Sequence, residues 1–484
     1  MTVLVAFIIQ DFITKFLRWR KMPPGPWGIP ILGYIPFLFK EPPYLVFERL
    51  WEKHGDIISV TLASKEQVVL NNWELIRDAF SRPEFTDRPD MVLIRLASSG
   101  IVTGNGSLWQ DNRRFTMRTL RDFGFGKTTL DGIISNEALA LCDVFKKKAK
   151  DPFGLHYSVN VAVLNVLWKM TAGEQYAYED ARMANFIELL NLTLEDTQSL
   201  GLIQFVPILK YLYPTALQAY RRVKNRIERI TDDFKGKIDE HKKNFDPDNI
   251  RDYIDAYLQE MKAQQNRGEE NTNFSDLQLR VNIQNLFLIG CETTANTIRW
   301  AILFLLRNLK VQEWIQAEVD NVIGRERLPS LADRDRMPYT EAFIMEVQRH
   351  ANVAPMGLPH CTNQDVEFAG YTIPKGTIVM GNLWACHFDP KYWPDPFKFD
   401  PTRFLESDGT LKTKNSSFLP FSLGKRQCLG EALAKMELFI FLTIFMQRFS
   451  FRLPEGATMP STEPIFSAIV NRPKPFKIVA EIRT

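Results

Sequence analysis

The chain has 484 residues, of which 45% are hydrophobic and 24% are charged, so it is globular and long enough to bury a large core. Its formal net charge of +3 gives no support to nucleic-acid binding, which favours a concentrated basic stripe. The five cysteines are widely spread and include no C-x-x-C pair, which argues against a zinc ribbon or a disulfide framework. We therefore expect no nucleic-acid partner, a reducing environment and free thiols.

The N-terminal 22 residues contain the one targeting signal of the sequence. The apolar run MTVLVAFII is interrupted by Gln10, Asp11 and Lys15, well short of the roughly 20 residues that a spanning helix needs. The basic flank RWRK and the proline-rich stretch MPPGPWGIPILG follow, and such a stretch cannot continue a helix. The pattern predicts a membrane anchor on the cytoplasmic face, with a frayed amphipathic helix as the alternative.

After this segment, the sequence indicates helices around a small amount of sheet. Residues 56–72 hold two alternating runs about a polar turn, which predicts a hairpin, and a helix follows to residue 81. Strand signals return at residues 365–382. The polar stretch at 261–274 is predicted to be a solvated loop between two helices.

The longest helical pattern runs from about residue 276 to 310 and predicts a helix through the core. Within it, Glu292 and Thr293 are polar groups in a segment committed to burial, and such groups need partners or a function. If the helix opens at Gly290, Thr293 turns inward beside a reaction centre with a carboxylate behind it. The alternative is a threonine bonded back to its own helix.

Two further segments carry chemically informative residues. Glu346 and Arg349 are three residues apart on one helix face, the spacing of an ordinary surface ion pair. If Arg403 joins them, the three form a buried network that locks segments together. In FSLGKRQCLG, Cys428 lies beside Arg426 and before a long helical pattern, surroundings that favour a thiolate.

These pieces, in this order, resemble the cytochrome P-450 family. The loop matches its haem-binding signature, F-x-x-G-x-R-x-C-x-G, at Phe421, Gly424, Arg426, Cys428 and Gly430. GCETT resembles the oxygen-activation motif, EVQR the E-x-x-R helix, FDPTRF the segment with the second arginine, WQDNRRF the W-x-x-x-R helix and PPGP the proline hinge. The amino-acid sequence of several stretches is similar to that of the microsomal drug- and steroid-oxidising branch of the family.

The resemblance implies a mainly α fold with small β-sheets (α+β), a single triangular haem domain over residues 23–484 with a long central helix. It implies haem b, with Cys428 as the iron ligand. Gly424 and Gly430 would allow close backbone approach to the porphyrin and the next helix. The haem propionates would be held by four side chains, Trp109, Arg113, His360 and Arg426. Thr293 would donate a hydrogen bond during oxygen activation, and Glu292 would help to relay protons.

Electrons must arrive from a partner, since the chain shows no flavin or nicotinamide fingerprint. The resemblance implies NADPH-cytochrome P-450 reductase, with cytochrome b5 as a second candidate, at the endoplasmic reticulum membrane. A basic face for this partner would consist of Arg114, Arg121, Lys127, Lys425 and Lys435, with Phe123 and Phe125 as apolar contacts. Each of these residues also fits a solvated charge run.

The substrate is expected to be a lipophilic small molecule. By analogy, its pocket includes Ile289, Gly290, Ala354 and Met356, and Ile289 stands where the family has alanine or glycine, so it would narrow the space over the haem. The apolar stretch at 199–214 predicts a second membrane contact. Two other functions stay open, a haem-thiolate isomerase or dehydratase acting on peroxides and a non-catalytic haem sensor; the Glu292–Thr293 pair favours a monooxygenase.

Overall fold

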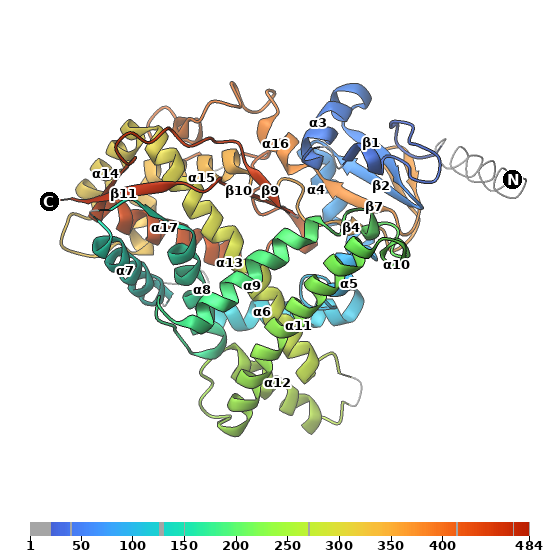
Figure 1. Ribbon diagram of the computed structural model, residues 1–484, viewed down its shortest axis with the longest axis horizontal. Coiled ribbons are helices and arrows are strands. Elements are labelled where there is room, and N and C mark those ends of the chain that lie inside the picture. The colour runs from blue at the N-terminus through green and yellow to red at the C-terminus, as the bar shows by residue number, and fades with distance from the viewer. Residues whose placement is uncertain are drawn as a thin grey trace, which may run out of the picture.

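The computed structural model describes residues 21–38, 41–124, 130–149, 151–269, 272–412, 415–467 and 469–483. The fold is mainly helical with small sheets, as predicted, and Figure 1 shows an outline that tapers toward α12 (Tyr253–Asn266). The expected anchor at residues 1–20 lies outside the described residues. None of the described helices is long and apolar enough to cross a membrane.

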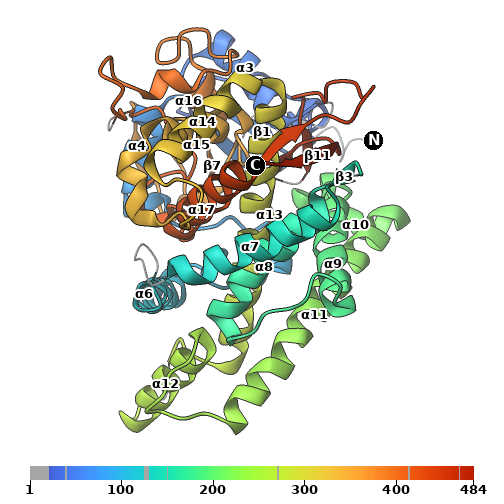
Figure 2. The same ribbon diagram turned by 90° about the vertical axis from the view of Figure 1, so that its left-hand side faces the viewer.

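Helices make up most of the described chain. Figure 1 shows most of them to the left of and below the strands of residues 57–70, with the helix of residues 43–54 above those strands, and Figure 2 shows α12 at the lower end of the molecule, away from these strands. In chain order they are α2 (Ile35–Leu38), α3 (Pro43–His54), α4 (Trp73–Ser81), α5 (Val92–Leu96), α6 (Gly106–Asp122), α7 (Asp131–Lys147), α8 (His156–Ala172), α9 (Ala181–Gln198), α10 (Leu209–Leu212), α11 (Pro214–Lys243), α12, α13 (Asp276–Arg307), α14 (Leu309–Val322), α15 (Pro338–Ala351), α16 (Leu383–Phe388) and α17 (Glu431–Arg448).

The largest sheet has the strand order β1-β2-β7-β4 and contains the hairpin that was predicted at residues 56–72. Strands β1 and β2 pair antiparallel, β2 pairs with β7 in parallel, and β7 pairs with β4 antiparallel. The strands are β1 (Ile57–Leu62), β2 (Lys65–Leu70), β3 (Phe153–Gly154), β4 (His360–Cys361), β5 (Val366–Phe368), β6 (Tyr371–Ile373), β7 (Ile378–Gly381), β8 (Phe449–Arg452), β9 (Ile465–Ser467), β10 (Val470–Arg472) and β11 (Lys477–Ile482).

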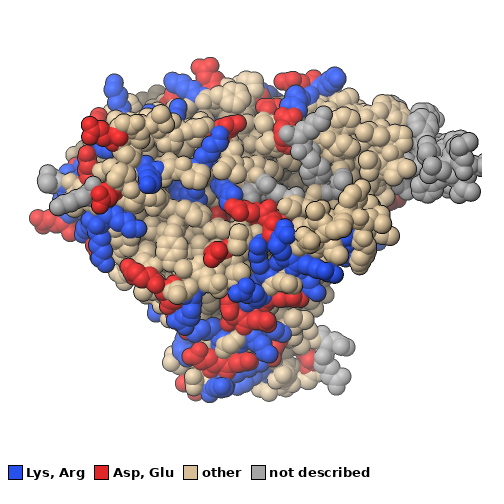
Figure 3. Space-filling view, viewed as in Figure 1, with Lys and Arg blue, Asp and Glu red and all other residues tan. Residues whose placement is uncertain are grey.

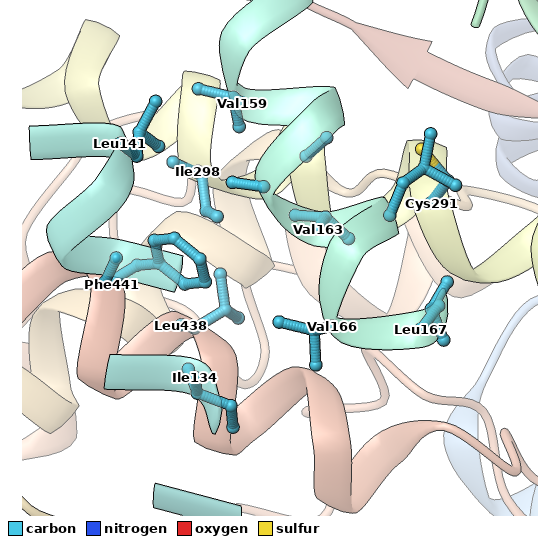
Figure 4. Close-up of a cluster of buried hydrophobic side chains, with 14 of the residues drawn as sticks. Ile134, Leu141, Val159, Val163, Val166, Leu167, Cys291, Ile298, Leu438 and Phe441 are labelled. Atoms are coloured by element: carbon cyan, nitrogen blue, oxygen red, sulfur yellow. The ribbon is translucent and has the colours of Figure 1, made fainter. Parts of the chain in front are cut away.

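The main core lies where α7, α8, α13 and α17 meet. Figure 4 shows how it is built: Leu141 from α7, Val163 from α8, Ile298 from α13 and Leu438 from α17 point toward one another. Residues on all sides of α13 are buried, as expected for a helix through the core. The Ser275 side chain accepts a hydrogen bond from the Gln278 amide and begins this helix.

The structure decides two questions about helix limits. Of the two alternatives left open at Gly290, an unbroken α13 is the one present, and the glycine packs closely against α8, since an added Cβ would meet Leu167 Cδ1 at 3.2 Å. The stretch at 261–274 is not a loop throughout, because α12 continues to Asn266. Met261 explains this helical extension, because it packs against the main core. This packing offsets the conformational entropy that is lost when its polar neighbours become helical.

Candidate active site

The loop before α17 presents Cys428 as an accessible side chain, whereas the other four cysteines are buried. A short 3-10 turn, Gly424–Arg426, shapes the loop. The Cys428 amide then donates to the Phe421 carbonyl at 3.0 Å, and the Gln427 amide donates to the Gly424 carbonyl at 3.1 Å. These bonds hold the thiol just before the first turn of α17, which begins at Glu431.

The two glycines of this loop differ in what they allow. Gly424 has φ +79°, and an added Cβ would come within 2.1 Å of the Phe80 carbonyl oxygen, so no side chain fits there. Gly430 has an ordinary φ of −84° and no atom within 4 Å of an added Cβ. The expected close approach of Gly430 to the porphyrin and the next helix stays a prediction.

The surroundings of Cys428 suit a sulfur that binds a cation. Part of the Cys428 side chain is accessible, but the protein atoms packed around it shield the sulfur from bulk solvent and raise the pKa of the thiol; the Gly430 amide hydrogen bond opposes that rise, and the charge of Glu431 adds to it. The cation of Arg113 and the Glu431 amide also favour the thiolate. Arg113 is tied to the loop, since its guanidinium donates to the Gln427 carbonyl. Backbone amides at a helix start together with one arginine make a donor set for a thiolate ligand.

Arg426, Arg113 and a residue that the sequence did not single out, Arg88, form a cationic cluster. Arg88 and Arg426 are buried, and none of the three pairs with a carboxylate among the described residues. Burial lowers the pKa of Arg426 to about 8, with Arg88 and Arg113 adding to the fall. Burial and Arg113 likewise lower the pKa of Arg88 to about 9. Three neighbouring cations without an acid are costly unless an anion joins them.

Backbone carbonyls from distant segments hold these arginines in place. Arg426 Nε donates to the Thr86 carbonyl at 2.7 Å and Nη2 to the Gly104 carbonyl at 2.6 Å. Arg88 Nη1 donates to the Pro359 carbonyl at 2.8 Å. A lone arginine in TDRPDM carries no motif, so its position beside the other two could be found only from the fold.

Trp109 and His360 lie at the same cluster. The Arg426 guanidinium stacks on the Trp109 ring at 3.6 Å, and the buried Trp109 Nε1 has no hydrogen-bond partner. His360 stacks on Phe80 with ring centroids 3.7 Å apart and donates from Nδ1 to the Phe85 carbonyl. Burial, followed by the charge of Arg88, lowers the pKa of His360 well below its usual value. This donor-rich, acid-free group fits the two carboxylates of a haem.

Thr293 and Glu292 occupy different environments on α13. The Thr293 hydroxyl donates to the Ile289 carbonyl at 3.0 Å, the alternative left open from the sequence. The buried Glu292 carboxylate accepts from the Asn160 amide of α8 at 2.9 Å and from the Asn296 amide at 3.0 Å. The two side chains therefore share no hydrogen bond in the described structure.

Glu292 begins a buried polar chain that the sequence reasoning missed. The Asn296 amide oxygen accepts from Arg299 at 2.9 Å, and Arg299 contacts His156 Nδ1 at 2.8 Å. Burial, with Arg299 next, lowers the pKa of His156 to about 4, so this histidine is neutral. Asn296 and Arg299 stand four and seven residues after Glu292, a helical spacing that was readable in the sequence.

One face of α13 remains accessible. Ile289, Gly290 and Thr293 are half-buried, although most of their helical neighbours are fully buried. Ala354 is also half-buried. Met356 is buried in the hydrophobic cluster around α3 and β1, together with Tyr44, and its assignment to a substrate pocket stays a prediction.

Glu346, Arg349 and Arg403 form a buried network. Arg349 Nε lies 2.7 Å from one oxygen of Glu346, and Arg403 Nε lies 3.0 Å from the other. Arg349 also donates to the His387 carbonyl at 2.8 Å, and the Asp400 amide donates to Glu346 at 2.9 Å. The carboxylate thus ties α15 to α16 and to the turn Pro401–Phe404.

The residues of the expected basic face lie in three settings. Arg114 and Arg121 are exposed on α6, and Lys425 is exposed beside the cysteine loop. Lys435 pairs with Glu431 at 2.7 Å. Phe123 is half-buried, and Lys127 and Phe125 lie outside the described residues. Arg118, which the sequence analysis did not name, is exposed between Arg114 and Arg121 and pairs with Glu260 at 3.4 Å.

Comparison with known proteins gives one consistent result. A family model described as Cytochrome P450 matches residues 23–480. The chain is 38% identical to cytochrome P450 2L1 of Panulirus argus over 472 residues, which cover 96% of this chain and 95% of that protein. It is 39% identical to cytochrome P450 2J3 of Rattus norvegicus, covering 93% and 90%, and 36% identical to cytochrome P450 2D15 of Canis lupus familiaris, covering 99% and 97%.

Proposed function

The chain belongs to the cytochrome P450 family and is a haem-thiolate monooxygenase, and we propose that it oxidises a lipophilic small molecule with electrons from NADPH through a reductase. The observation that supports the active-site assignment best is the accessible Cys428, with two backbone amides and Arg113 stabilising its sulfur. We assign the catalytic unit to residues 23–484 as one domain.

Each residue of the site receives a role from its position. Cys428 ligates the haem iron, and Phe421 and Gly424 shape the loop that presents the thiol. Trp109, Arg113, His360 and Arg426 hold the propionates, and the unpartnered Trp109 Nε1 supplies one donor. A haem held by these residues would supply the chemistry of oxygen activation and of oxygen transfer to the substrate.

The accessible face of α13 bounds the substrate. We assign Ile289, Gly290 and Ala354, all of them half-buried, to the lining of the substrate pocket. Thr293 donates a proton when its hydroxyl turns from the Ile289 carbonyl, to which it is bonded in this structure. The Glu292 carboxylate leaves the two asparagine amides that hold it, takes up a proton from solvent and passes that proton on to the Thr293 hydroxyl. The presence of the acid and the alcohol favours monooxygenation over peroxide rearrangement.

Electron delivery is assigned to the cationic face near the cysteine loop. Arg114 and Arg121 on α6 and Lys425 in the loop are exposed and suit an acidic partner surface. We propose NADPH-cytochrome P450 reductase as that partner, with cytochrome b5 as a second donor. Lys435 contributes less, because Glu431 already neutralises it.

A membrane setting follows from the apolar surface at α10. Ile208, Tyr211, Leu212 and Tyr213 are 67%, 70%, 69% and 56% exposed. Large exposed apolar side chains that adjoin one another mark a membrane or partner surface. We propose that this surface rests on the cytoplasmic face of the endoplasmic reticulum membrane, where a lipophilic substrate concentrates.

The function is tested by reconstituting the haem-loaded protein with a reductase. NADPH should be consumed with substrate, and the product should carry one oxygen atom from labelled O2. A haem sensor predicts no substrate-dependent NADPH consumption, and an isomerase or dehydratase predicts turnover of a peroxide without reductase. Either of those results contradicts the proposal.

A further inference from the structure

A second cavity opens on the opposite side of α13 from Thr293. It has a volume of about 570 Å³ and lies between α5, α10, α11 and the N-terminal part of α13. On α13 it is lined by Leu277, Arg280 and Gln284, which share one face. Thr293 follows Gln284 by nine residues, two and a half turns, so its side chain leaves the opposite face. We call this cavity the α11 groove.

The α11 groove is cationic. Arg95, Lys210, Lys224 and Arg280 line it, against two acids, Glu228 and Asp232. Arg95 pairs with Asp90 and Lys224 lies 3.5 Å from Glu228, whereas Arg280 is half-buried and forms no ion pair within the described part of the chain. Figure 3 shows Lys and Arg side chains gathered over α11 beside the uncharged surface at α10.

The remaining polar groups of the groove are donors as well. Gln284 is 1% exposed, and its side-chain oxygen accepts from the Thr231 hydroxyl at 3.0 Å. That bond leaves the buried amide nitrogen of Gln284 without a partner. The Lys210 ammonium lies over the Tyr220 ring, 4.4 Å from its centre. Among the described residues, no carboxylate forms an ion pair with it. A ligand with acceptor oxygens would satisfy these donors.

Apolar side chains make up the rest of the lining. They are Val92, Leu96, Pro207, Ile227, Leu277 and Val281. The volume falls within the range of roughly 300 to 1,000 Å³ that is usual for small-molecule sites. A hydrocarbon chain can therefore lie inside the groove while an anionic group meets Arg280.

We propose that the α11 groove binds a free long-chain carboxylate as a second ligand, at a site separate from the substrate pocket. The groove itself supplies the apolar contacts, so the chain of the ligand does not have to stay in a bilayer. Arg280 pairs with the carboxylate, and Lys210 and Lys224 add attraction at the mouth. Binding at this site does not depend on the roles assigned to Thr293 and Glu292.

The test is calorimetric binding of laurate to the full-length, haem-loaded protein with the iron position saturated by an azole. The saturated haem spectrum confirms that the substrate side is blocked during the titration. Laurate should still bind, and 1-dodecanol, which lacks the charge, should bind at least about tenfold more weakly. Absence of laurate binding to the blocked protein overturns the proposal.

Variants locate the site. Arg280→Gln should weaken laurate binding by about tenfold or more, and Arg280→Lys should weaken it less, because the charge remains. The matched control is Arg221→Gln, which removes an exposed arginine of α11 outside the groove and should leave laurate affinity unchanged. Equal affinity of Arg280→Gln and the parent overturns the proposal. A second outcome also overturns it: phosphatidylserine vesicles bind in a way that depends on Arg280, and laurate does not bind. The groove would then be a site for lipid headgroups.

Discussion

Arg88 shows how one buried side chain can serve a cofactor without belonging to a motif. Its guanidinium bonds the Val102 and Pro359 carbonyls, and it lies near Arg113 and Arg426 with no acid paired to any of them in the described structure. The charges are thus held ready for an anion that the protein does not provide. We propose that Arg88 stabilises the haem propionates together with the four residues predicted from the sequence.

Replacing Arg88 should therefore weaken haem retention through its charge. In Arg88→Met, haem should pass to apomyoglobin about tenfold faster, because one charge-assisted interaction is lost. The reduction potential should fall, since a removed cation favours the more positive oxidised iron. Arg88→Lys keeps the charge and should recover most of both properties. If the lysine variant behaves like the methionine variant, Arg88 acts only by holding carbonyls.

Glu437 on α17 is a buried carboxyl that should make stability depend on pH. Burial raises its pKa to about 8 from an ordinary value of 4.5, against a smaller opposing effect of Thr294, and one of its oxygens has no partner. The folded state holds the proton more tightly than the unfolded state. The associated stability is thus complete below about pH 4.5 and is lost as the pH rises through about 8.

Glu437→Gln should remove this dependence. The variant should exceed the parent in free energy of unfolding by a few kcal/mol at pH 8, and the difference should shrink toward pH 5. Urea unfolding followed by tryptophan fluorescence at several pH values measures it. Glu455→Gln, which changes an exposed glutamate, is the control and should follow the parent. An unchanged pH profile in Glu437→Gln contradicts the assignment.

At the scale of elements, α11 and α12 are joined by a buried ion pair. His241 Nε2 lies 2.8 Å from Asp252 Oδ2, and His241 Nδ1 donates to the Lys237 carbonyl at 2.8 Å. Burial acts to lower the pKa of His241, but Asp252 outweighs it, and the charge of Asp255 adds to the net rise. The raised pKa means that the pair stabilises this corner below about pH 6.5 and that the stabilisation is lost as the pH rises through the folded-state pKa.

Hydrogen exchange should detect that loss at the α11–α12 corner. After correction for intrinsic rates, amides at the end of α11 and the start of α12 should lose protection as the pH rises above about 6.5. His241→Gln cannot titrate and should show low protection with no such change. Amides of the central part of α13 serve as the internal reference. A parent-like pH dependence in His241→Gln contradicts the prediction.

The elements that could be predicted are those whose signal is local. The hairpin at 56–72 follows from alternation around a polar turn, and α13 follows from a long apolar pattern between caps. The cysteine loop follows from five fixed positions. The reason for its glycine at 424 is not local, because it is the close approach of the Phe80 carbonyl from a distant part of the chain.

What could not be predicted depends on partners far away in the chain. Met356 carries no sign in the sequence that it packs with Tyr44. The sequence left open whether the helix opens at Gly290, because the close neighbour of that glycine, Leu167, is on another helix. The sequence is compatible with a Thr293 hydroxyl that points toward a reaction centre and with one that bonds to its own helix. Only the three-dimensional structure shows that the second arrangement is present.

At the scale of the whole molecule, membrane contact should combine two separate regions. Removing residues 1–20 should weaken binding to phosphatidylcholine vesicles without abolishing it, because the α10 surface remains. In that truncated protein, Ile208→Ser with Leu212→Ser should reduce binding by a further tenfold or more, since each side chain contributes about 1.5 to 3 kcal/mol when buried. Vesicle flotation measures both steps.

The control for this double change is Leu328→Ser, an exposed leucine distant in sequence from α10. It should leave vesicle binding unaltered. A truncated protein with no vesicle binding at low salt would show that the α10 surface is not a membrane contact. The same result would leave the assigned oxidation chemistry untouched, because that chemistry rests on Cys428 and α13.

The carbonyls that the buried arginines hold come from residues 86, 102, 104 and 359, so one charged cluster gathers chain segments that are hundreds of residues apart. Like charges resist that gathering until a dianion arrives, and a ligand that binds only the folded form draws the chain toward it by mass action. The yield of folded protein should then rise with the porphyrin supply during synthesis. The amount of haem would then set the amount of folded enzyme, independently of the substrate concentration.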